Sequence, residues 1–349
     1  MSAAPEAAPV AEHVPSLPLD SLHVLDAREG LERLPDASVD CVVTSPPYWA
    51  TRVYAIQPVP WADGSVCVLG LEPDFEAYLD HLAEVFEEVR RVLKPTGTLW
   101  VNLGDVYASG TRARINGVLR ALVGQPAMGG GTRSFRALPD KTLCLIPERF
   151  ALRMLSSGWT LRNKVIWHKM NFLPASVRDR FACSYEFLYL FSKADRYYFD
   201  LDPVRVPHTS PEAQRYRTMP EQTRWRGLLN AGQRGAPTRG QRFHREGKNP
   251  GDCWFVATRG EGHHHPAAYP EALCERPILA GCPPGGLVVD PFAGSGTTCV
   301  VAKRLGRRFI GFDASRAYVE QAAARLKSVR AGMPSIQEDR LPEEAGAAA

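Results

Sequence analysis

The sequence predicts an α/β fold built on a mostly parallel, doubly wound sheet. Short apolar runs with the length of buried strands alternate with segments whose apolar residues recur at helical spacing. Helices that connect such strands cover both faces of the sheet. A chain of 349 residues, 44% of them apolar, is long enough for one large domain of this kind with insertions.

Each element is predicted from its own pattern, and the clearest is a helix at 74–93. Its apolar residues fall on one face with Glu and Arg between them, and a Lys-Pro-Thr-Gly turn ends it. Further helices are predicted at 30–34, 147–157, 270–280, 297–305 and 315–326. Strands are predicted at 22–25, 40–43, 98–103, 159–168, 186–192, 253–257, 286–290 and 308–312.

One domain is expected over residues 21–330. Residues 1–20 and 331–349 are predicted to be disordered tails because they lack apolar periodicity. The start of the chain is rich in Ala and Pro without a basic residue, which is unlike a secretory signal. No apolar run approaches the roughly 20 residues of a membrane helix. We therefore expect a cytoplasmic protein with no membrane segment.

The eight cysteines and the histidine triplet do not predict a metal site. The cysteines are spread along the chain and none forms a Cys-x-x-Cys pair, so we expect reduced thiols and no zinc. Residues 263–265 are three adjacent histidines, and three adjacent imidazoles in a loop cannot all point at one ion.

Positive charge is confined to two segments of the chain. Residues 110–141 carry six basic residues against one acid, and residues 201–250 carry ten against four. Such confinement is typical of a face that binds a polyanion, with arginine-rich loops that bind nothing as the alternative. The candidate contacts for such a polyanion, DNA if the resemblance described below holds, are Arg112, Arg114, Arg224, Arg226, Arg242 and Arg245.

A Thr-Ser-Pro-Pro-Tyr-Trp stretch at 44–49 follows a predicted buried strand. Open α/β sheets bind ligands beyond the carboxyl ends of their strands, so this turn is a candidate catalytic site. The Ser45 hydroxyl and the Pro46 carbonyl are acceptors for the N–H groups of an exocyclic amine, and Pro46 and Pro47 fix the backbone. Tyr48 is expected to stack on the base that bears the amine. Taken alone, the motif is equally compatible with an ordinary loop.

A second turn, after the strand at 286–290, has the residues of a nucleotide-type cofactor loop. Gly294 and Gly296 allow a tight turn close to a ligand. The next strand ends in Asp313, where a carboxylate can accept both hydroxyls of a ribose. The loop lacks G-x-G-x-x-G and a P-loop lysine, which favours S-adenosylmethionine over a dinucleotide. A glycine turn without a ligand is the alternative. The candidate contacts are Asp290, Pro291, Phe292, Gly294, Ser295, Gly296, Thr297, Thr298 and Asp313.

Asn102 and Asp105 follow or end another predicted strand, at 98–103. They either line the same cleft or cap a turn.

Together these motifs resemble those of the amino-group DNA methyltransferases. Residues 290–298 are similar to the S-adenosylmethionine motif of that family, and residues 307–313 to the segment that follows it. Residues 265–270 resemble the element that closes over the methionine part, which implies a cofactor contact for Tyr269. The likeness covers about residues 22–326, without the two basic segments.

The catalytic motif precedes the cofactor motif, an order that resembles the permuted β-type members with a TSPPYW motif. The resemblance implies a Rossmann-like S-adenosylmethionine-dependent methyltransferase fold of circularly permuted order. It places the target-recognition region at 201–252 and leaves 110–141 as a basic loop insertion. Asp26 becomes a candidate contact for the adenine of the cofactor, with N-capping of the next helix as the alternative.

The resemblance further implies methyl transfer to a base flipped out of double-stranded DNA. In that family Ser at the first motif position occurs mostly in N4-cytosine enzymes, so Ser45 predicts N4-cytosine methylation, with N6-adenine as the alternative. A catalytically silent DNA-binding protein, an RNA methyltransferase and a protein-glutamine methyltransferase are rivals. A cognate restriction endonuclease is a candidate partner, and the protein is expected at the nucleoid. The sequence predicts neither the oligomeric state nor the recognition site.

Overall fold

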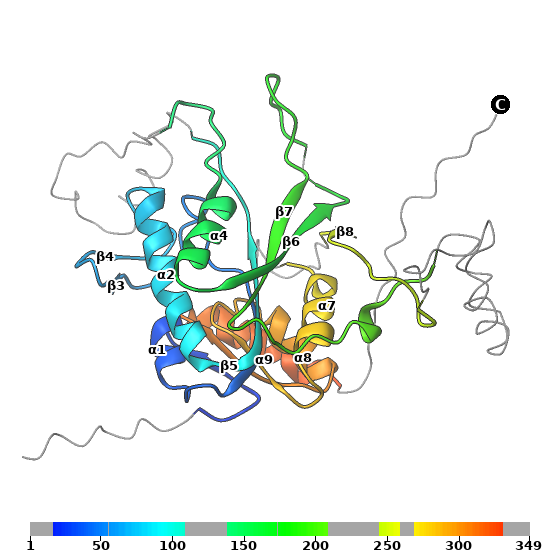
Figure 1. The fold of residues 1–349 in the computed structure, drawn as a ribbon. Helices are drawn as coiled ribbons and strands as arrows, with labels where there is room; N and C mark the ends of the chain where they lie inside the picture. The colour runs from blue at the N-terminus through cyan, green and yellow to red at the C-terminus, as the bar shows by residue number, and fades with distance from the viewer. Residues whose placement is uncertain are drawn as a thin grey trace, which may run out of the picture.

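The computed structural model describes residues 17–54, 56–108, 138–172, 174–208, 244–258 and 269–330. Its centre is an eight-stranded sheet in the order β1-β10-β9-β2-β5-β7-β6-β8 (Figure 1). The strands are β1 (Ser21–Val24), β2 (Val39–Thr44), β5 (Leu93–Leu103), β6 (Thr160–Lys169), β7 (Tyr185–Ser192), β8 (Cys253–Val256), β9 (Leu287–Asp290) and β10 (Arg308–Asp313). The helices are α1 (Ala27–Glu32), α2 (Phe75–Val92), α4 (Ile146–Ser156), α7 (Glu271–Gly281), α8 (Thr297–Arg304) and α9 (Arg316–Ser328), with a 3-10 turn η1 (Asp202–Val204).

The sheet is mostly parallel, as predicted. Strands β1, β10, β9, β2 and β5 pair in parallel, and β6 pairs in parallel with β8. Strand β7 runs antiparallel to both of its neighbours, β5 and β6. The amino end of β7 therefore lies at the edge of the sheet where the parallel strands end.

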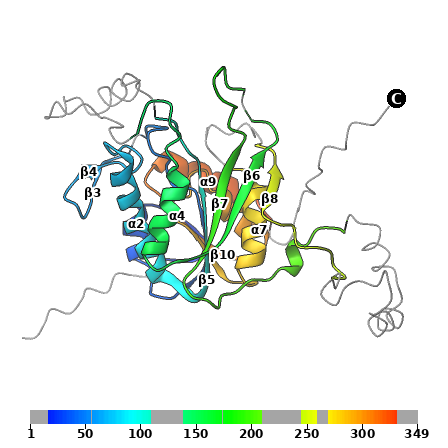
Figure 2. The same ribbon diagram turned by 45° about the horizontal axis from the view of Figure 1, so that its top comes forward.

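Helices cover both faces of this sheet (Figure 2). Alternate residues of β2 point to opposite faces, with Val42 packing on the side of α1, α2 and α4, and Val43 on the side of α7, α8 and α9. Strand β9 divides in the same way, with Val289 on the first side and Val288 on the second. Strands that are buried on both faces explain why these segments are continuous apolar runs.

The structure also contains a short hairpin that the sequence analysis did not predict, β3 (Val59–Pro60) with β4 (Val66–Cys67). Each of its strands has two residues, which is too short for a periodic signal. Strand β5 begins at Leu93, five residues before the predicted start at 98. Residues 94–97, which were predicted to form a turn, are part of this strand.

Several predicted features lie outside the described residues. These include Arg112, Arg114, Arg224, Arg226 and Arg242, as well as the three histidines at 263–265. Arg245 is described and is exposed. Asp20, in the segment predicted as a tail, donates its backbone N–H to the carbonyl of Phe309 at 2.7 Å. No helix in the described ranges is long and apolar enough to cross a membrane.

Candidate active site

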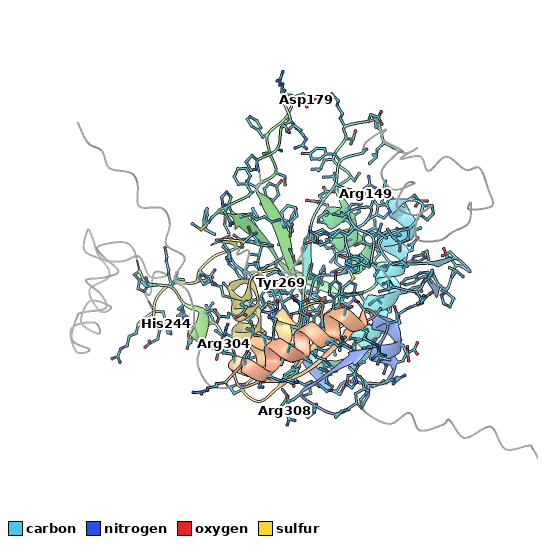
Figure 3. All side chains as sticks on the ribbon, turned by 180° about the vertical axis from the view of Figure 1, so that it is seen from behind. Arg149, Asp179, His244, Tyr269, Arg304 and Arg308 are labelled. Atoms are coloured by element: carbon cyan, nitrogen blue, oxygen red, sulfur yellow. The ribbon has the colours of Figure 1, made fainter. Side chains whose placement is uncertain are left out.

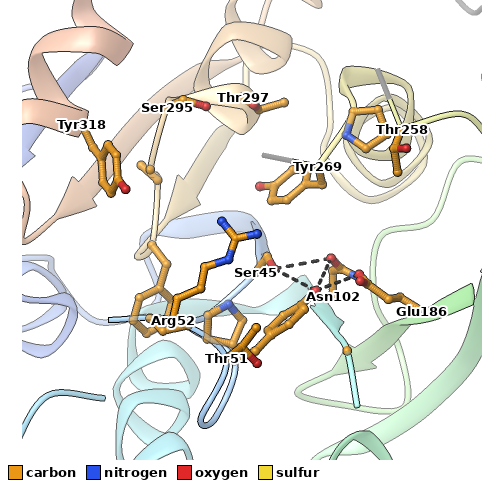
Figure 4. A pocket seen from close by; sticks show the side chains of 18 of the residues that line it. Ser45, Thr51, Arg52, Asn102, Glu186, Thr258, Tyr269, Ser295, Thr297 and Tyr318 are labelled. Carbon is orange, nitrogen blue, oxygen red and sulfur yellow. Dashed lines mark hydrogen bonds between the residues drawn. The ribbon is translucent and has the colours of Figure 1, made fainter. Parts of the chain in front are cut away.

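A cavity of about 1200 Å³ lies at the carboxyl edge of the parallel strands (Figure 4). Residues 45–48 after β2, residues 291–295 after β9 and Asp313 at the end of β10 all line it. The two motifs, which are more than 240 residues apart in the chain, therefore face one space. The cavity is larger than the roughly 300–1000 Å³ typical of a site for one small ligand.

The backbone of the catalytic turn is held by buried side chains around it. Tyr78 on α2 donates its hydroxyl to the Pro47 carbonyl at 2.8 Å. Trp49 donates its indole N–H to the Glu72 carbonyl at 3.1 Å. Within the described residues, no protein donor reaches the carbonyl of Pro46, which lines the cavity. Of the two proline carbonyls, only that of Pro47 has a donor among the described residues, and Pro46 lies on the cavity wall.

A hydrogen-bond network connects the turn to the middle of the sheet (Figure 4). The Tyr48 hydroxyl lies 2.9 Å from Asn102 Oδ1 and 2.8 Å from Glu186 Oε2. Ser45 Oγ lies 3.4 Å from Asn102 Oδ1 and 3.5 Å from the Tyr48 oxygen, long contacts of a kind that often tighten when substrate binds. Glu186 also forms an ion pair with Lys169 on the cavity wall.

The Asn102 amide has one orientation that satisfies its neighbours. Its Nδ2 donates to the Phe187 carbonyl at 3.0 Å and to Glu186 Oε2 at 3.2 Å. Its Oδ1 consequently faces Ser45 and Tyr48 and acts as an acceptor. A Ser45 hydroxyl that donates its single hydrogen to Asn102 keeps its lone pairs free for a donor in the cavity.

Tyr48 lies between this network and Gly104. A Cβ at residue 104 would lie 2.6 Å from Cε2 of Tyr48, so the ring position requires glycine there. Burial and the neighbouring Glu186 carboxylate raise the pKa of Tyr48 well above its usual range, which keeps the phenol protonated as a donor. Its ring lines the cavity, and stacking on a base remains a prediction.

Asp290, the last residue of β9, supports the cofactor loop from beneath. It is buried, and its Oδ1 accepts from the Thr44 hydroxyl at 2.6 Å and from the Phe292 N–H at 3.1 Å. Its Oδ2 accepts from the Tyr269 hydroxyl at 3.1 Å, and Tyr269 also contacts Thr298. Asp290 was predicted to contact the cofactor, but the structure places it behind the loop, where it ties β9 to β2.

The glycines of the loop adopt left-handed conformations, which allow the tight turn that the sequence predicted. Gly294 has φ of 49° and Gly296 has φ of 79°. A Cβ at Gly296 would lie 2.6 Å from Cβ of Ala322, so this glycine also lets α9 approach. The predicted contacts divide accordingly. The cavity is lined by Pro291, Phe292, Gly294, Ser295 and Thr297, whereas Asp290, Gly296 and Thr298 of the same segment do not line it.

Asp313 lies on the cavity wall at the end of β10. Its Oδ2 accepts from the Gly294 N–H at 2.9 Å, and its Oδ1 accepts from the Ser315 N–H at 2.8 Å. Each oxygen keeps a further lone pair for a ligand hydroxyl. Burial raises the pKa of Asp313 to about 6, so the carboxylate is ionised at neutral pH and protonated in mild acid.

Some of the remaining predicted residues both support the fold and line the cavity. Asp26 caps α1 by accepting from the Arg28 N–H at 3.0 Å, and it also lines the cavity. Tyr269 lines the cavity as well. Asp105 accepts from the N–H groups of Leu145 and Ile146 and also lines the cavity, as Asn102 does, so both alternatives hold for Asp105.

The sequence analysis missed several cavity residues. Glu186 and Lys169 line the cavity but were not singled out. Their position as charged residues at the ends of predicted strands could have indicated them. Arg52 and Tyr318 also line the cavity (Figure 4) and lie in segments without a recognisable motif.

A group of side chains behind the turn brings potential metal donors together. Atoms of Cys67, Glu72 and His81 lie within 4.8 Å of one another. Glu72 Oε1 lies 3.1 Å from His81 Nδ1, its Oε2 accepts from the Gly70 N–H at 2.9 Å, and Trp61 stacks on His81. Burial raises the pKa of the Cys67 thiol to about 11. These contacts act as a hydrogen-bonded support for the turn.

The fold and the two facing motifs define the class of protein. Residues 39–324 match the model of the N6/N4 DNA methylase family, and the chain belongs to that family. This result confirms the predicted DNA methyltransferase family.

Individual relatives are similar over most of their length. The chain is 34% identical over 307 residues to the Type II methyltransferase M.SmaI of Serratia marcescens, with 86% of this chain and 88% of that protein covered. It is 35% identical over 309 residues to the Type II methyltransferase M.Cfr9I of Citrobacter freundii, with 86% of each covered. The solved PvuII DNA methyltransferase (cytosine-N4-specific) shares the fold with a TM-score of 0.57 at 21% identity, covering 89% of this chain and 88% of that one.

Proposed function

We propose that this protein transfers a methyl group from S-adenosylmethionine to the exocyclic N4 of a flipped cytosine at a specific site in duplex DNA. The observation that carries the proposal is the position of the Ser45 hydroxyl and the Pro46 carbonyl. Both belong to residues on the same cavity as Asp313 and the 291–295 loop.

The residues around the loop fit the cofactor. When bound, S-adenosylmethionine supplies an electrophilic sulfonium methyl group. Asp313 has lone pairs for the two ribose hydroxyls, and Asp26 offers an acceptor for the adenine amine. Phe292 and the neighbouring residues of the loop line the cavity, and the Phe292 side chain is apolar.

Two acceptors activate the target amine. The amine of cytosine is a poor nucleophile because its lone pair is delocalised into the ring. Hydrogen bonds from its two N–H groups to Ser45 Oγ and the Pro46 carbonyl localise that lone pair on nitrogen. Because the prolines and the Tyr78 contact fix the turn beforehand, these acceptors need no ordering during the reaction.

Ser45 supports cytosine over adenine as the target. The family includes both N4 and N6 enzymes. The resemblance that the sequence carries associates a neutral Ser at this position with N4-cytosine, and an Asp with N6-adenine. We also propose that the chain has the circularly permuted motif order and belongs to the TSPPYW subgroup.

The relatives support a role in restriction and modification. M.SmaI and M.Cfr9I are named as Type II methyltransferases. We extend this to duplex DNA as the substrate, a cognate endonuclease as the partner, and the nucleoid as the location. The predicted arginines, including the exposed Arg245, would contact phosphates.

Nucleoside mass spectrometry of plasmid DNA from expressing cells tests this proposal, with a Ser45→Ala strain as the control. N4-methylcytosine that depends on Ser45 is the expected result. N6-methyladenine would retain the family and overturn the target. If the plasmid carries neither N4-methylcytosine nor N6-methyladenine, the proposal that this chain methylates DNA is overturned.

A further inference from the structure

The loop between β6 and β7 projects from the rim of the active site (Figures 1 and 3). It spans residues 170–184, and Figure 3 shows Asp179 at the end of the projection. The described residues from 174 to 181 are all exposed. Phe181 is 96% exposed, the highest value among the large apolar side chains of the described residues. A fully exposed Phe ring on a projecting loop is a candidate contact for another molecule.

The loop is held in this position from several sides. At its base, Asn171 Oδ1 accepts from the Thr258 backbone N–H at 2.7 Å. Near its end, the Arg180 guanidinium lies 3.9 Å from the ring centre of Tyr107. Asp179 pairs with Lys141 at 2.5 Å. The ring of Phe181 is thus presented to solvent directly after two residues, Asp179 and Arg180, that contact other segments.

The same loop forms part of the cavity wall. Met170, Phe172 and Cys183 line the cavity together with Ser45. Phe181 is two residues from Cys183, so their Cα atoms are separated by at most about 8 Å. The rise between stacked bases is about 3.4 Å. The backbone of Phe181 therefore lies within two or three base steps of Cys183, a residue on the wall of this cavity.

We propose that Phe181 is a wedge that enters the base stack of duplex DNA next to the flipped target. An apolar ring fills the space that the target base leaves and blocks its return. The exposed Arg178 precedes the ring in the same loop and is a candidate contact for a phosphate beside the opened step. This inference rests on methylation of a flipped base, and it holds for cytosine or adenine.

The test compares Phe181→Ala with wild type on two duplexes that carry the site found by sequencing the methylated plasmid. One duplex has a normal partner opposite the target, and the other has an abasic position there, which lowers the cost of flipping. Phe199→Ala is the matched control, because Phe199 is exposed and adjoins Tyr198, which bonds to Thr96 at the opposite end of β5.

We expect single-turnover methylation of the normal duplex to fall about 10- to 100-fold in Phe181→Ala, since one stacked ring is lost. On the abasic duplex the variant should come within about threefold of wild type, with unchanged S-adenosylmethionine affinity. An equal loss on both duplexes, or no loss on either, would overturn the wedge. A change of oligomeric state without loss of activity, seen by light scattering, would assign Phe181 to a second copy of the chain instead.

Failure of the wedge proposal can be distinguished from failure of the proposed function. If the plasmid carries N6-methyladenine, the proposed target is wrong, and the same pair of duplexes with an adenine target still tests Phe181.

Discussion

The catalytic turn and the cofactor loop face one cavity but are held in different ways. The turn depends on two prolines, on the Tyr78 hydroxyl and on the uncharged amide of Asn102. The loop depends on two carboxylates, since Asp290 supports it from beneath and Asp313 accepts its Gly294 N–H. The turn is fixed mainly by backbone restraint and by the hydrogen-bond network around Tyr48, and the loop by the carboxylates of Asp290 and Asp313.

This difference predicts separable effects of mutation and pH. Changes in the turn should lower the rate of methyl transfer while cofactor affinity stays the same. Changes in the loop should lower cofactor affinity, and the loop should respond to pH because its acids have raised pKa values. The following predictions test that separation.

Asp290→Ala should have the largest effect. It removes the acceptor of the Thr44 hydroxyl, the Phe292 N–H and the Tyr269 hydroxyl in a buried setting. We expect a loss of roughly 3–5 kcal/mol in the free energy of unfolding and no detectable S-adenosylmethionine binding. Denaturant unfolding and calorimetry measure both, with Asp290→Asn as the milder control. Unchanged stability with intact binding would show that Asp290 does not organise the loop.

Asn102→Ala should mainly slow the chemical step. Without Oδ1 the Ser45 hydroxyl loses the acceptor that orients it, so we expect a roughly 100-fold fall in single-turnover rate. Cofactor affinity should stay within twofold. Asn163→Ala, an exposed asparagine on β6, is the matched control. A fall in cofactor affinity equal to the fall in rate would mean that the turn and the loop are not separate.

The affinity for S-adenosylmethionine should fall as the pH falls. Ribose hydroxyls need an ionised acceptor, and the Asp313 carboxyl, with a pKa of about 6, takes up a proton as the pH drops through that value. From pH 7 to pH 5 the ionised fraction decreases about tenfold, so calorimetry should show about tenfold weaker binding. Asp313→Asn should bind weakly at both values. A pH-independent wild type would argue against ribose binding by Asp313.

Much of this molecule follows from sequence pattern. The strands at the centre of the sheet are continuous apolar runs because both of their faces are buried, and this made β2, β9 and β10 predictable. The glycines of the loop were predictable because their positive φ is unfavourable for other residues.

The missed parts depend on contacts between distant segments. Glu186 reaches the site because β7 runs antiparallel, which brings the amino end of this strand to the carboxyl edge of its neighbours. Its sequence gives no sign of that direction. Asp290 was correctly associated with the loop, but its burial depends on Thr44 and Tyr269, which are distant in the chain. The short β3–β4 hairpin carries too few residues for a pattern.

The central claim is that the Ser45 hydroxyl activates the target amine opposite a separately held cofactor. Single-turnover methyl transfer by Ser45→Ala, combined with calorimetric titration of S-adenosylmethionine, tests it most directly. We predict a fall in the rate of about 100- to 1000-fold with the dissociation constant for the cofactor unchanged within twofold. A wild-type rate in Ser45→Ala would contradict the account, since the amine would then be activated without this acceptor.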